Sequence, residues 1–295
     1  YHPEKYPKFF PYLKRKISTI IIPYFFFVIV TVIICEVTNG IRDQDVFKWC
    51  QYFQGVLWGN RAIFPITGAV WFLQSIFWIE IGYYFIEKIR STVKVSIVII
   101  ILLSISIILS FHEIALPLSL DSALSGIIFY HIGYVLSKNA LITKWKSFKK
   151  FHLVTWLIIF IINLLLIYIN KPVNPRICEY SFFPLYYFNA VIGTGVWYAV
   201  ALILDKKESF RLFKQVRIIV RYIGLNSIVF LGINQLIIKG LYLVLTLVMP
   251  VEFGVVRAGR NIIICFVTLV ICSSVAWVIN KTPLCIMIGR ELKKG

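Results

Sequence analysis

The chain has 295 residues, of which 59% are hydrophobic and 15% charged, and its formal net charge is +18. A soluble globular domain typically carries about 25% charged residues, so this composition excludes an ordinary soluble protein. The apolar residues are grouped in blocks, and several blocks approach or exceed the roughly 20 residues that a helix needs to cross a bilayer. The sequence therefore predicts a polytopic membrane protein.

Eight apolar blocks predict eight membrane-spanning helices, and hence an all-α transmembrane helical bundle. Barrel strands would alternate polar and apolar residues over about ten residues, whereas a helix satisfies its backbone hydrogen bonds internally, as lipid requires. The seventh block is long enough to tilt or to form a short helix followed by a span. In chain order the predicted spans are 18–36, 67–86, 95–111, 121–137, 152–169, 183–204, 223–248 and 261–279.

The basic residues are distributed unevenly between the two sides of these spans. With the first 17 residues placed inside, 23 of the 31 Lys and Arg residues fall on the cytoplasmic side and seven on the other, while Lys239 lies within a span. Basic loops remain in the cytoplasm. Both ends of the chain are therefore predicted to lie on the cytoplasmic side of the plasma membrane, together with segments 87–94, 138–151 and 205–222.

The net charge and the cysteines bear on other possible partners. The basic residues hold loops inside and contact anionic lipid headgroups, and no nucleic-acid motif accompanies them, so membrane lipids are expected as partners and nucleic acid is not. The six cysteines show no CxxC pair and no metal-ligand spacing, so no metal is expected. A disulfide on the outer side remains open among Cys35, Cys50 and Cys178.

Ionisable residues within the predicted spans are candidates for function. Glu80, His131 and Lys239 lie in three different predicted spans. Asp121 lies at the outer end of the fourth predicted span, 121–137. Such residues either line a polar cavity or pair across helices to hold the bundle together, and both readings stay open. A general base needs a pKa near neutrality and reach to its substrate, which makes His131 and His112 the candidate bases of this chain.

The predicted outer loop 37–66 combines aromatic side chains with polar and charged ones, including Trp49, Trp58 and Arg61. Aromatic rings beside polar groups suit the faces and hydroxyls of a sugar. They are equally typical of the aromatic belt at a membrane interface. The loop therefore predicts either a saccharide-binding surface or an interfacial anchor.

Four short strings, in this order along the chain, resemble the acyltransferase-3 family. Residues 10–24 end a basic stretch with Ile-Pro-Tyr, as at the start of the family's third helix, and residues 69–73 contain its Trp-Phe-Leu. Residues 120–134 are similar to its Asp-x-Ala and Phe-Tyr-x-x-Gly segment, and residues 223–228 to its Gly-x-Asn-Ser. The agreement covers nearly the whole chain. The subgroup it resembles most contains fucose-acetylase-like enzymes that modify bacterial surface oligosaccharides.

The resemblance implies a single integral-membrane acyltransferase domain over 1–295, preceded by two further spans. Family members typically have ten spans, and the first two carry the histidine regarded as the catalytic base, so that histidine is expected before Tyr1. The chain departs from the family's Arg-x-x-Arg before the third helix, because Ser18 stands in place of the second arginine. A histidine that often follows the late Asn-Ser is replaced by the region of Asn234 and Gln235.

The resemblance also implies a reaction and its participants. The family moves an acyl group, usually acetyl, from cytoplasmic acyl-CoA (acetyl-CoA) to a hydroxyl of a glycan or lipid-linked sugar. The residues expected to hold the coenzyme phosphates are Lys14, Arg15 and Lys16. The alternative is that these cations only keep the segment on the cytoplasmic side. Arg15 is the favoured phosphate ligand, because a guanidinium binds phosphate bidentately. His131 is the catalytic candidate within the chain. The expected substrate-binding residues are Trp71, Glu80, Asp121 and Asn226. For Asp121 the alternative role is to cap a helix.

Two other functions remain open at this point. A transporter or flippase for a lipid-linked saccharide would be expected to contain inverted repeats or matching broken helices, and the sequence shows no internal repeat. The other alternative is a catalytically inactive fragment or scaffold. O-acetylation of a surface polysaccharide is the function that the resemblance favours.

Overall fold

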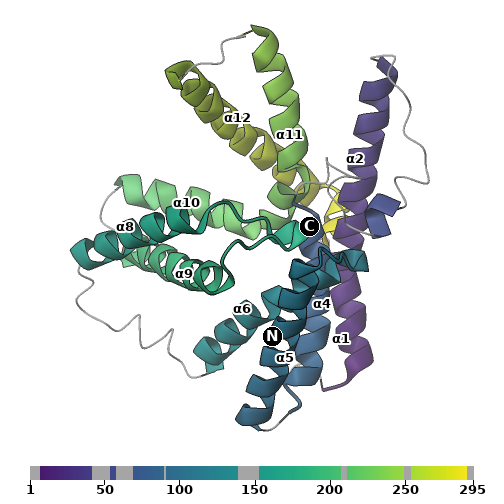
Figure 1. Ribbon diagram of the computed structural model, residues 1–295. Helices are drawn as coiled ribbons and strands as arrows, with labels where there is room; N and C mark the ends of the chain where they lie inside the picture. The colour runs from purple at the N-terminus through teal and green to yellow at the C-terminus, as the bar shows by residue number, and fades with distance from the viewer. Residues whose placement is uncertain are drawn as a thin grey trace. The chain divides into compact units, whose positions relative to one another are not determined.

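The computed structural model describes residues 7–41, 54–57, 69–89, 91–138, 153–206, 211–248 and 254–290 (Figure 1). Within these ranges the regular structure is helical, apart from an isolated bridge between Asn174 and Glu179. The chain forms two compact units, which are described separately. Unit 1 contains Tyr1–Pro3, Ile79–Leu116 and Leu120–Arg221, and unit 2 contains Glu4–Trp78, Pro117–Ser119 and Tyr222–Gly295.

The predicted all-α membrane fold is confirmed, and a helix occupies each of the eight predicted span positions. The differences lie at the ends and in the connections, where short helices precede or separate the long ones. The described helices are α1 (Phe9–Lys16), η2 (Ile17–Ile21), α2 (Ile22–Ile41), α4 (Trp71–Ile86), α5 (Thr92–Phe111), η3 (Pro117–Ser119), α6 (Leu120–Lys138), α8 (Leu153–Asn170), η4 (Pro175–Ile177), α9 (Phe183–Lys206), α10 (Arg211–Leu225), α11 (Ser227–Val248), α12 (Gly254–Lys281) and η5 (Pro283–Ile288).

Five of the described helices are long and apolar enough to cross a membrane, as expected of a multi-pass membrane protein. They cover Phe9–Thr38, Thr92–Phe111, Phe183–Leu202, Ser227–Thr246 and Arg257–Lys281, and Val154–Asn170 is a shorter apolar helix. The predicted spans in α4 and α6 fall outside this group. α4 has only 16 residues, and the polar residues of α6 lower its hydropathy.

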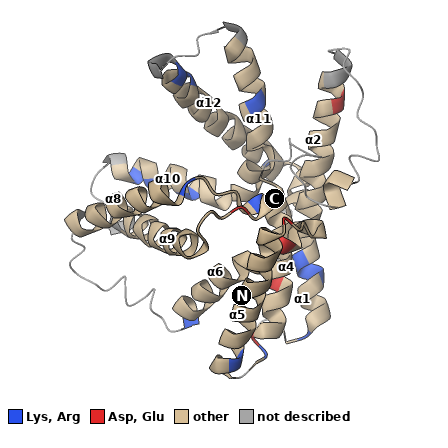
Figure 2. Ribbon diagram, in the orientation of Figure 1, with Lys and Arg blue, Asp and Glu red and all other residues tan. Residues whose placement is uncertain are grey.

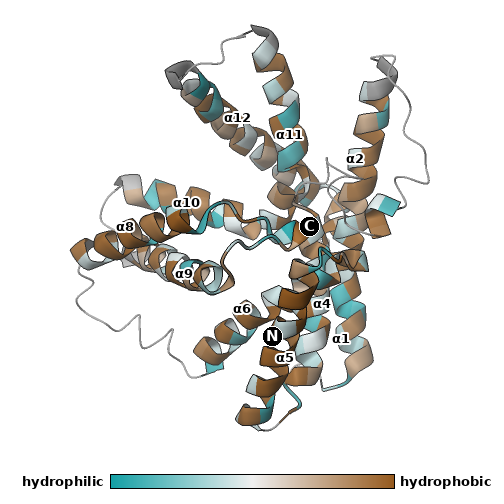
Figure 3. Ribbon diagram, viewed as in Figure 1, coloured by the Kyte–Doolittle hydropathy of each residue, from teal (hydrophilic) through white to brown (hydrophobic). Residues whose placement is uncertain are grey.

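The surfaces of the long helices are suited to hydrocarbon. Figure 3 shows α5, α8 and α12 to be hydrophobic over most of their length, and Figure 2 shows that charged residues are sparse along the long helices. Large apolar side chains such as Ile100, Leu165 and Phe266 are exposed on them. A helix that exposes apolar residues in this way is stable in lipid, where those side chains meet acyl chains rather than water.

The core of unit 2 is formed where α2, α11, α12 and η5 pack together, around Phe27, Val229, Cys272 and Ala276. Phe27 is 1% exposed and Val229 is fully buried. A Cβ atom built on Gly232 would overlap the Phe27 ring. Gly232 therefore allows α2 and α11 to approach closely, as small residues do between membrane helices.

Replacing Gly232 by alanine is expected to lower the free energy of unfolding by about 1–3 kcal/mol, because the buried Phe27 ring must move. Gly126→Ala is the matched control, since there the nearest atom is Cδ1 of Ile79, the far end of a flexible side chain, 2.8 Å away. That control is expected to be close to neutral, because alanine also improves helix propensity. Thermal unfolding in detergent compares the stability of the two variants. Equal stability would show that the Phe27 ring can move aside at no cost in free energy.

Unit 1 contains the helix pairs α5–α6 and α8–α9. Across the second pair, Nδ2 of Asn163 donates to the backbone oxygen of Asn189 at 3.1 Å, and both residues are buried. Asn163 thus pairs across helices, which is the ordinary structural role of a buried amide in a membrane bundle.

Candidate functional site

Carboxylates, phenols and a histidine meet between α4 and α6 in unit 1. The hydroxyl of Tyr130 donates to Oε2 of Glu80 at 2.9 Å, and that of Tyr134 donates to Oε1 of Glu87 at 3.2 Å. Glu80 lies on α4, and Glu87 directly follows the last residue of α4, with its backbone N–H still bonded to the Tyr83 oxygen at 2.9 Å. The two carboxylates are seven residues apart and therefore share one side of the helix and its continuation. We call this set the α4–α6 cluster, and its members are Glu80, Tyr83, Glu87, Tyr130, His131 and Tyr134.

His131 is held in this cluster by Tyr83. Its Nδ1 lies 2.9 Å from the Tyr83 hydroxyl, and the Tyr83 ring, 1% exposed, packs 4.7 Å from the ring of Tyr130 between centroids. When Nδ1 carries the proton and donates to the phenol oxygen, Nε2 has a free lone pair and can accept a proton. The hydrogen bond to Tyr83 can thus hold His131 in the tautomer that a general base requires.

Asp121 lies in the first turn of α6 and is 5% exposed. Its Oδ1 accepts the backbone N–H of Ser122 at 2.8 Å, and its Oδ2 accepts that of Leu116 at 3.3 Å. The carboxylate therefore accepts one backbone N–H from the first turn of α6 and one from the segment before it, which is a structural role; a role of Asp121 in substrate binding stays a prediction. Asp121 precedes His131 by ten residues, about 15 Å along the helix axis, so α6 does not bring the two together.

A second hydrogen-bonded cluster in unit 1 joins α6 to the segment between α8 and α9. The Ser122 hydroxyl donates to the Pro175 oxygen at 2.9 Å, and the Tyr180 hydroxyl donates to Oγ of Ser125 at 2.6 Å. Burial raises the pKa of the nearby Cys178 thiol to about 11, with a smaller contribution from Asp121. Cys178 is therefore a protonated, unreactive thiol at neutral pH.

The sequence allowed an outer disulfide among Cys35, Cys50 and Cys178, and two of these three cysteines form none. Cys35 and Cys178 are free thiols, while Cys50 lies outside the described residues. The predicted outer loop 37–66 also lies largely outside them, so its saccharide-binding and anchoring alternatives stay predictions. Within the described ranges no group of three or more His, Cys, Asp and Glu residues could hold a metal ion.

In unit 2 the basic stretch forms the last turn of α1 and leads into the π-helix η2. Lys14 and Arg15 are exposed, and Nζ of Lys16 lies 5.3 Å from the centre of the Tyr12 ring. The stretch is therefore accessible to an anionic ligand. Gly289, at φ +74°, packs against η2, since its Cβ would lie 2.8 Å from Cα of Thr19.

Asn226 occupies the break between α10 and α11 and is 3% exposed. Its Nδ2 donates to the Tyr222 oxygen at 2.8 Å, while its Oδ1 accepts Nδ2 of Asn280 at 2.8 Å and Nη1 of Arg290 at 2.9 Å. Arg290 also donates to Asn280 and to the backbone oxygen of Leu225. These contacts support a structural role for Asn226, which ties the residues after α12 to the start of α11.

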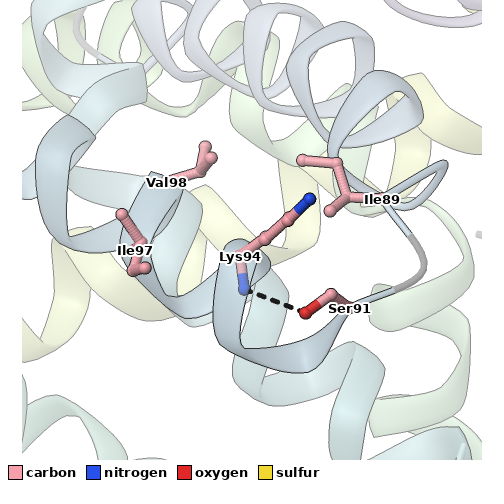
Figure 4. A pocket seen from close by; sticks show the side chains of 5 residues that line it. All are labelled: Ile89, Ser91, Lys94, Ile97 and Val98. Carbon is pink, nitrogen blue, oxygen red and sulfur yellow. Dashed lines mark hydrogen bonds between the residues drawn. The ribbon is translucent and has the colours of Figure 1, made fainter.

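A surface hollow of about 630 Å³ lies at the turn between α4 and α5 (Figure 4). Its lining is mainly apolar, and the Lys94 side chain extends across it while its backbone N–H donates to Oγ of Ser91 at 3.4 Å. None of the predicted site residues lines it; the lining residues are Ile89, Ser91, Lys94, Ile97 and Val98. A second hollow of about 300 Å³, between α8 and α9, is apolar and contains none of them either.

Residues 2–278 match a family described as an acyltransferase domain, the acyltransferase-3 family. The chain belongs to this family. Searches of curated proteins and of solved structures found no match. The family match covers most of both compact units and every predicted site residue. This chain is therefore a membrane acyltransferase, and the match does not specify its acyl group or acceptor.

In this acyltransferase the predicted site residues are divided between the units. Unit 1 contains Glu80, His131 and Asp121, and the first two belong to the α4–α6 cluster. Unit 2 contains the basic stretch, Trp71 and Asn226. Lys239, which the sequence placed with Glu80 and His131 in a possible shared cavity, is exposed on α11 in unit 2.

Sequence reasoning passed over several polar residues of this acyltransferase. Tyr83 and Tyr130 were missed because tyrosines are common in membrane helices, and Arg290 because it follows the last span. Gln74 is 2% exposed, its Nε2 donates to the Val56 oxygen at 3.0 Å, and its Oε1 accepts the Ser119 hydroxyl at 3.1 Å. A glutamine within a predicted span was a signal that could have identified it.

Proposed function

We propose that this acyltransferase transfers an acetyl group from cytoplasmic acetyl-CoA to a hydroxyl of a cell-surface or lipid-linked saccharide. The observation that supports it most is the family match over residues 2–278. The resemblance of the four motif strings to the fucose-acetylase-like subgroup supports the choice of acetyl and saccharide. In this proposal, residues 1–295 are a single acyltransferase domain in the plasma membrane, with both ends of the chain in the cytoplasm.

The donor binds on the cytoplasmic side, at the basic stretch. Lys14 and Arg15 are exposed at the end of α1, where they meet the phosphates of the coenzyme. Arg15 contributes most, because its planar guanidinium can form two parallel hydrogen bonds to one phosphate. The acyl thioester then extends toward the membrane interior.

Arg15→Ala is expected to raise the KM for acetyl-CoA about tenfold or more, as the loss of a hydrogen bond to a charged group would, and to leave the KM for the acceptor nearly unchanged. Steady-state kinetics of the full-length protein, with each substrate varied in turn, measure both constants. Lys138→Ala, an exposed cation at the end of α6, is the matched control. An unchanged donor KM in the Arg15 variant would remove Arg15 from the donor site.

The reaction forms an ester C–O bond and breaks the thioester C–S bond. Nε2 of His131 takes the hydroxyl proton as the saccharide oxygen attacks the acyl carbon, and the coenzyme leaves as its thiol after the proton is returned to sulfur. Neighbouring amide or cationic groups stabilise the tetrahedral oxyanion. Trp71, Glu80, Asp121 and Asn226 are the proposed acceptor-side residues.

Release of the coenzyme thiol distinguishes this reaction from transport. Full-length protein in proteoliposomes is supplied with acetyl-CoA, and free thiol is followed with a thiol-reactive dye in the presence and absence of a lipid-linked oligosaccharide. The expected result is thiol release that depends on the oligosaccharide. Movement of the oligosaccharide across the bilayer without thiol release would instead support a transporter.

A further inference from the structure

Helix α10 (Arg211–Leu225) has one side that carries its basic residues, with exposed Ile218 among them, and another side that is apolar. Lys214, Arg217 and Arg221 are spaced three and four residues apart and therefore lie along one side of the helix. Four apolar residues, Val216, Ile219, Val220 and Ile223, are spaced in the same way along the other. Figure 2 shows basic residues and no acidic residue on α10.

The apolar side of α10 is only partly covered by protein. Ile219 is 58% exposed and Val220 is 54% exposed, whereas Val216 and Ile223 are half-buried. In water, exposed apolar side chains at successive positions would be unfavourable. α10 is not among the helices that are long and apolar enough to cross the membrane, so a transmembrane position does not account for this exposure.

Chain connectivity restricts where α10 can lie. The helices before and after it, α9 and α11, each contain a candidate span. Only residues 207–210 separate α10 from α9, and Asn226 alone separates it from α11. Because α9 ends and α11 begins on the same side of the membrane, both ends of α10 are held near one membrane surface. A helix of 15 residues, about 22 Å long, is then favoured to lie along that surface.

We propose that α10 is an interfacial helix that binds anionic phospholipids of the cytoplasmic leaflet. Its apolar side, centred on Ile219 and Val220, enters the boundary between headgroups and acyl chains, about 5–10 Å deep. Its basic side, where Lys214 and Arg221 are exposed, contacts phosphate groups of the lipids. The cytoplasmic side follows from the distribution of basic residues, and the binding itself does not depend on acyl transfer.

The test places an environment-sensitive dye on each side of α10 in the full-length protein. Val220→Cys and Lys214→Cys are labelled separately in proteoliposomes containing about one-third anionic lipid, and the parent protein, labelled identically, gives the signal of the native cysteines. The expected result is that nitroxide-bearing lipids quench the dye at 220, while aqueous iodide quenches the dye at 214. Equal iodide quenching at both positions would place α10 in water and overturn the proposal.

The preference for anionic lipid is tested by removing charge. With the dye at 220, Arg221→Gln is expected to lower the ratio of membrane-bound to unbound α10 about fivefold in anionic vesicles. This is the effect expected from removing one basic residue near an anionic membrane surface. In vesicles of neutral lipid the same change should have little effect. Equal responses in both vesicles would reject anionic lipid as the ligand. Thermal unfolding verifies that each variant is folded, and neither readout requires acyl transfer.

Discussion

Replacing Asn226 by leucine is expected to lower the free energy of unfolding by about 2 to 3 kcal/mol. The substitution removes the oxygen that accepts hydrogen bonds from Asn280 and Arg290 and the amide that donates to Tyr222. Leucine fills the buried position without replacing these bonds, so polar groups at the joint between α10, α11 and the residues after α12 lose their partners. Thermal or denaturant unfolding of the full-length protein measures the loss.

Asn226→Asp is the matched control for this prediction. Aspartate retains an oxygen at the position that Asn280 and Arg290 reach, so we expect it to keep most of the stability that leucine loses. The aspartate variant also separates the two roles considered for this residue. If it is stable but raises the KM for the acceptor saccharide, Asn226 contacts substrate as well; if leucine is as stable as the native protein, the network does not hold this joint together.

The second prediction concerns the proposed proton transfer. His131→Gln is expected to lower kcat by about 10² to 10⁴-fold, the range that a positioned general base contributes, while the fold remains intact. Tyr83→Phe keeps the buried ring but removes the hydroxyl 2.9 Å from Nδ1 of His131. It is expected to have a smaller effect, because the imidazole stays in place while its tautomer is no longer fixed.

The control for this prediction is His112→Gln. His112 follows the last residue of α5, outside the α4–α6 cluster, and its replacement should leave kcat within about a factor of two or three of the native value, as is usual for residues away from the reacting groups. A loss of less than about tenfold for His131→Gln would assign proton abstraction to a different residue.

The positions of the long helices could be predicted from the sequence because the lipid environment requires long apolar blocks. The break at Asn226 is a different case. The sequence allowed a short helix followed by a span over 223–248, but the helix breaks at Asn226 because of bonds from Asn280 and Arg290. Those partners are more than 50 residues away along the chain, and no local pattern indicates such a contact.

For the candidate site, the charged and titratable residues could be predicted from the sequence, but their hydrogen-bond partners could not. Glu80 and His131 stand out in the sequence because charged or titratable groups are unfavourable in lipid. Their partners Tyr130 and Tyr83 do not stand out, since tyrosine is compatible with membrane helices whether or not it is paired. The register of α4 against α6 decides which phenol meets which carboxylate or ring nitrogen. That register depends on packing between helices, which the pattern of either helix alone does not determine.

Transfer of a labelled acyl group tests the proposed function most directly. Full-length protein in proteoliposomes is incubated with acetyl-CoA labelled in the acetyl group and with a lipid-linked oligosaccharide. The account predicts that label appears on the oligosaccharide as an ester that hydroxylamine releases, and that His131→Gln reduces its rate of formation. Absence of label on the oligosaccharide, with protein shown to be folded by its thermal unfolding, would contradict an O-acetyltransferase acting on this class of acceptor.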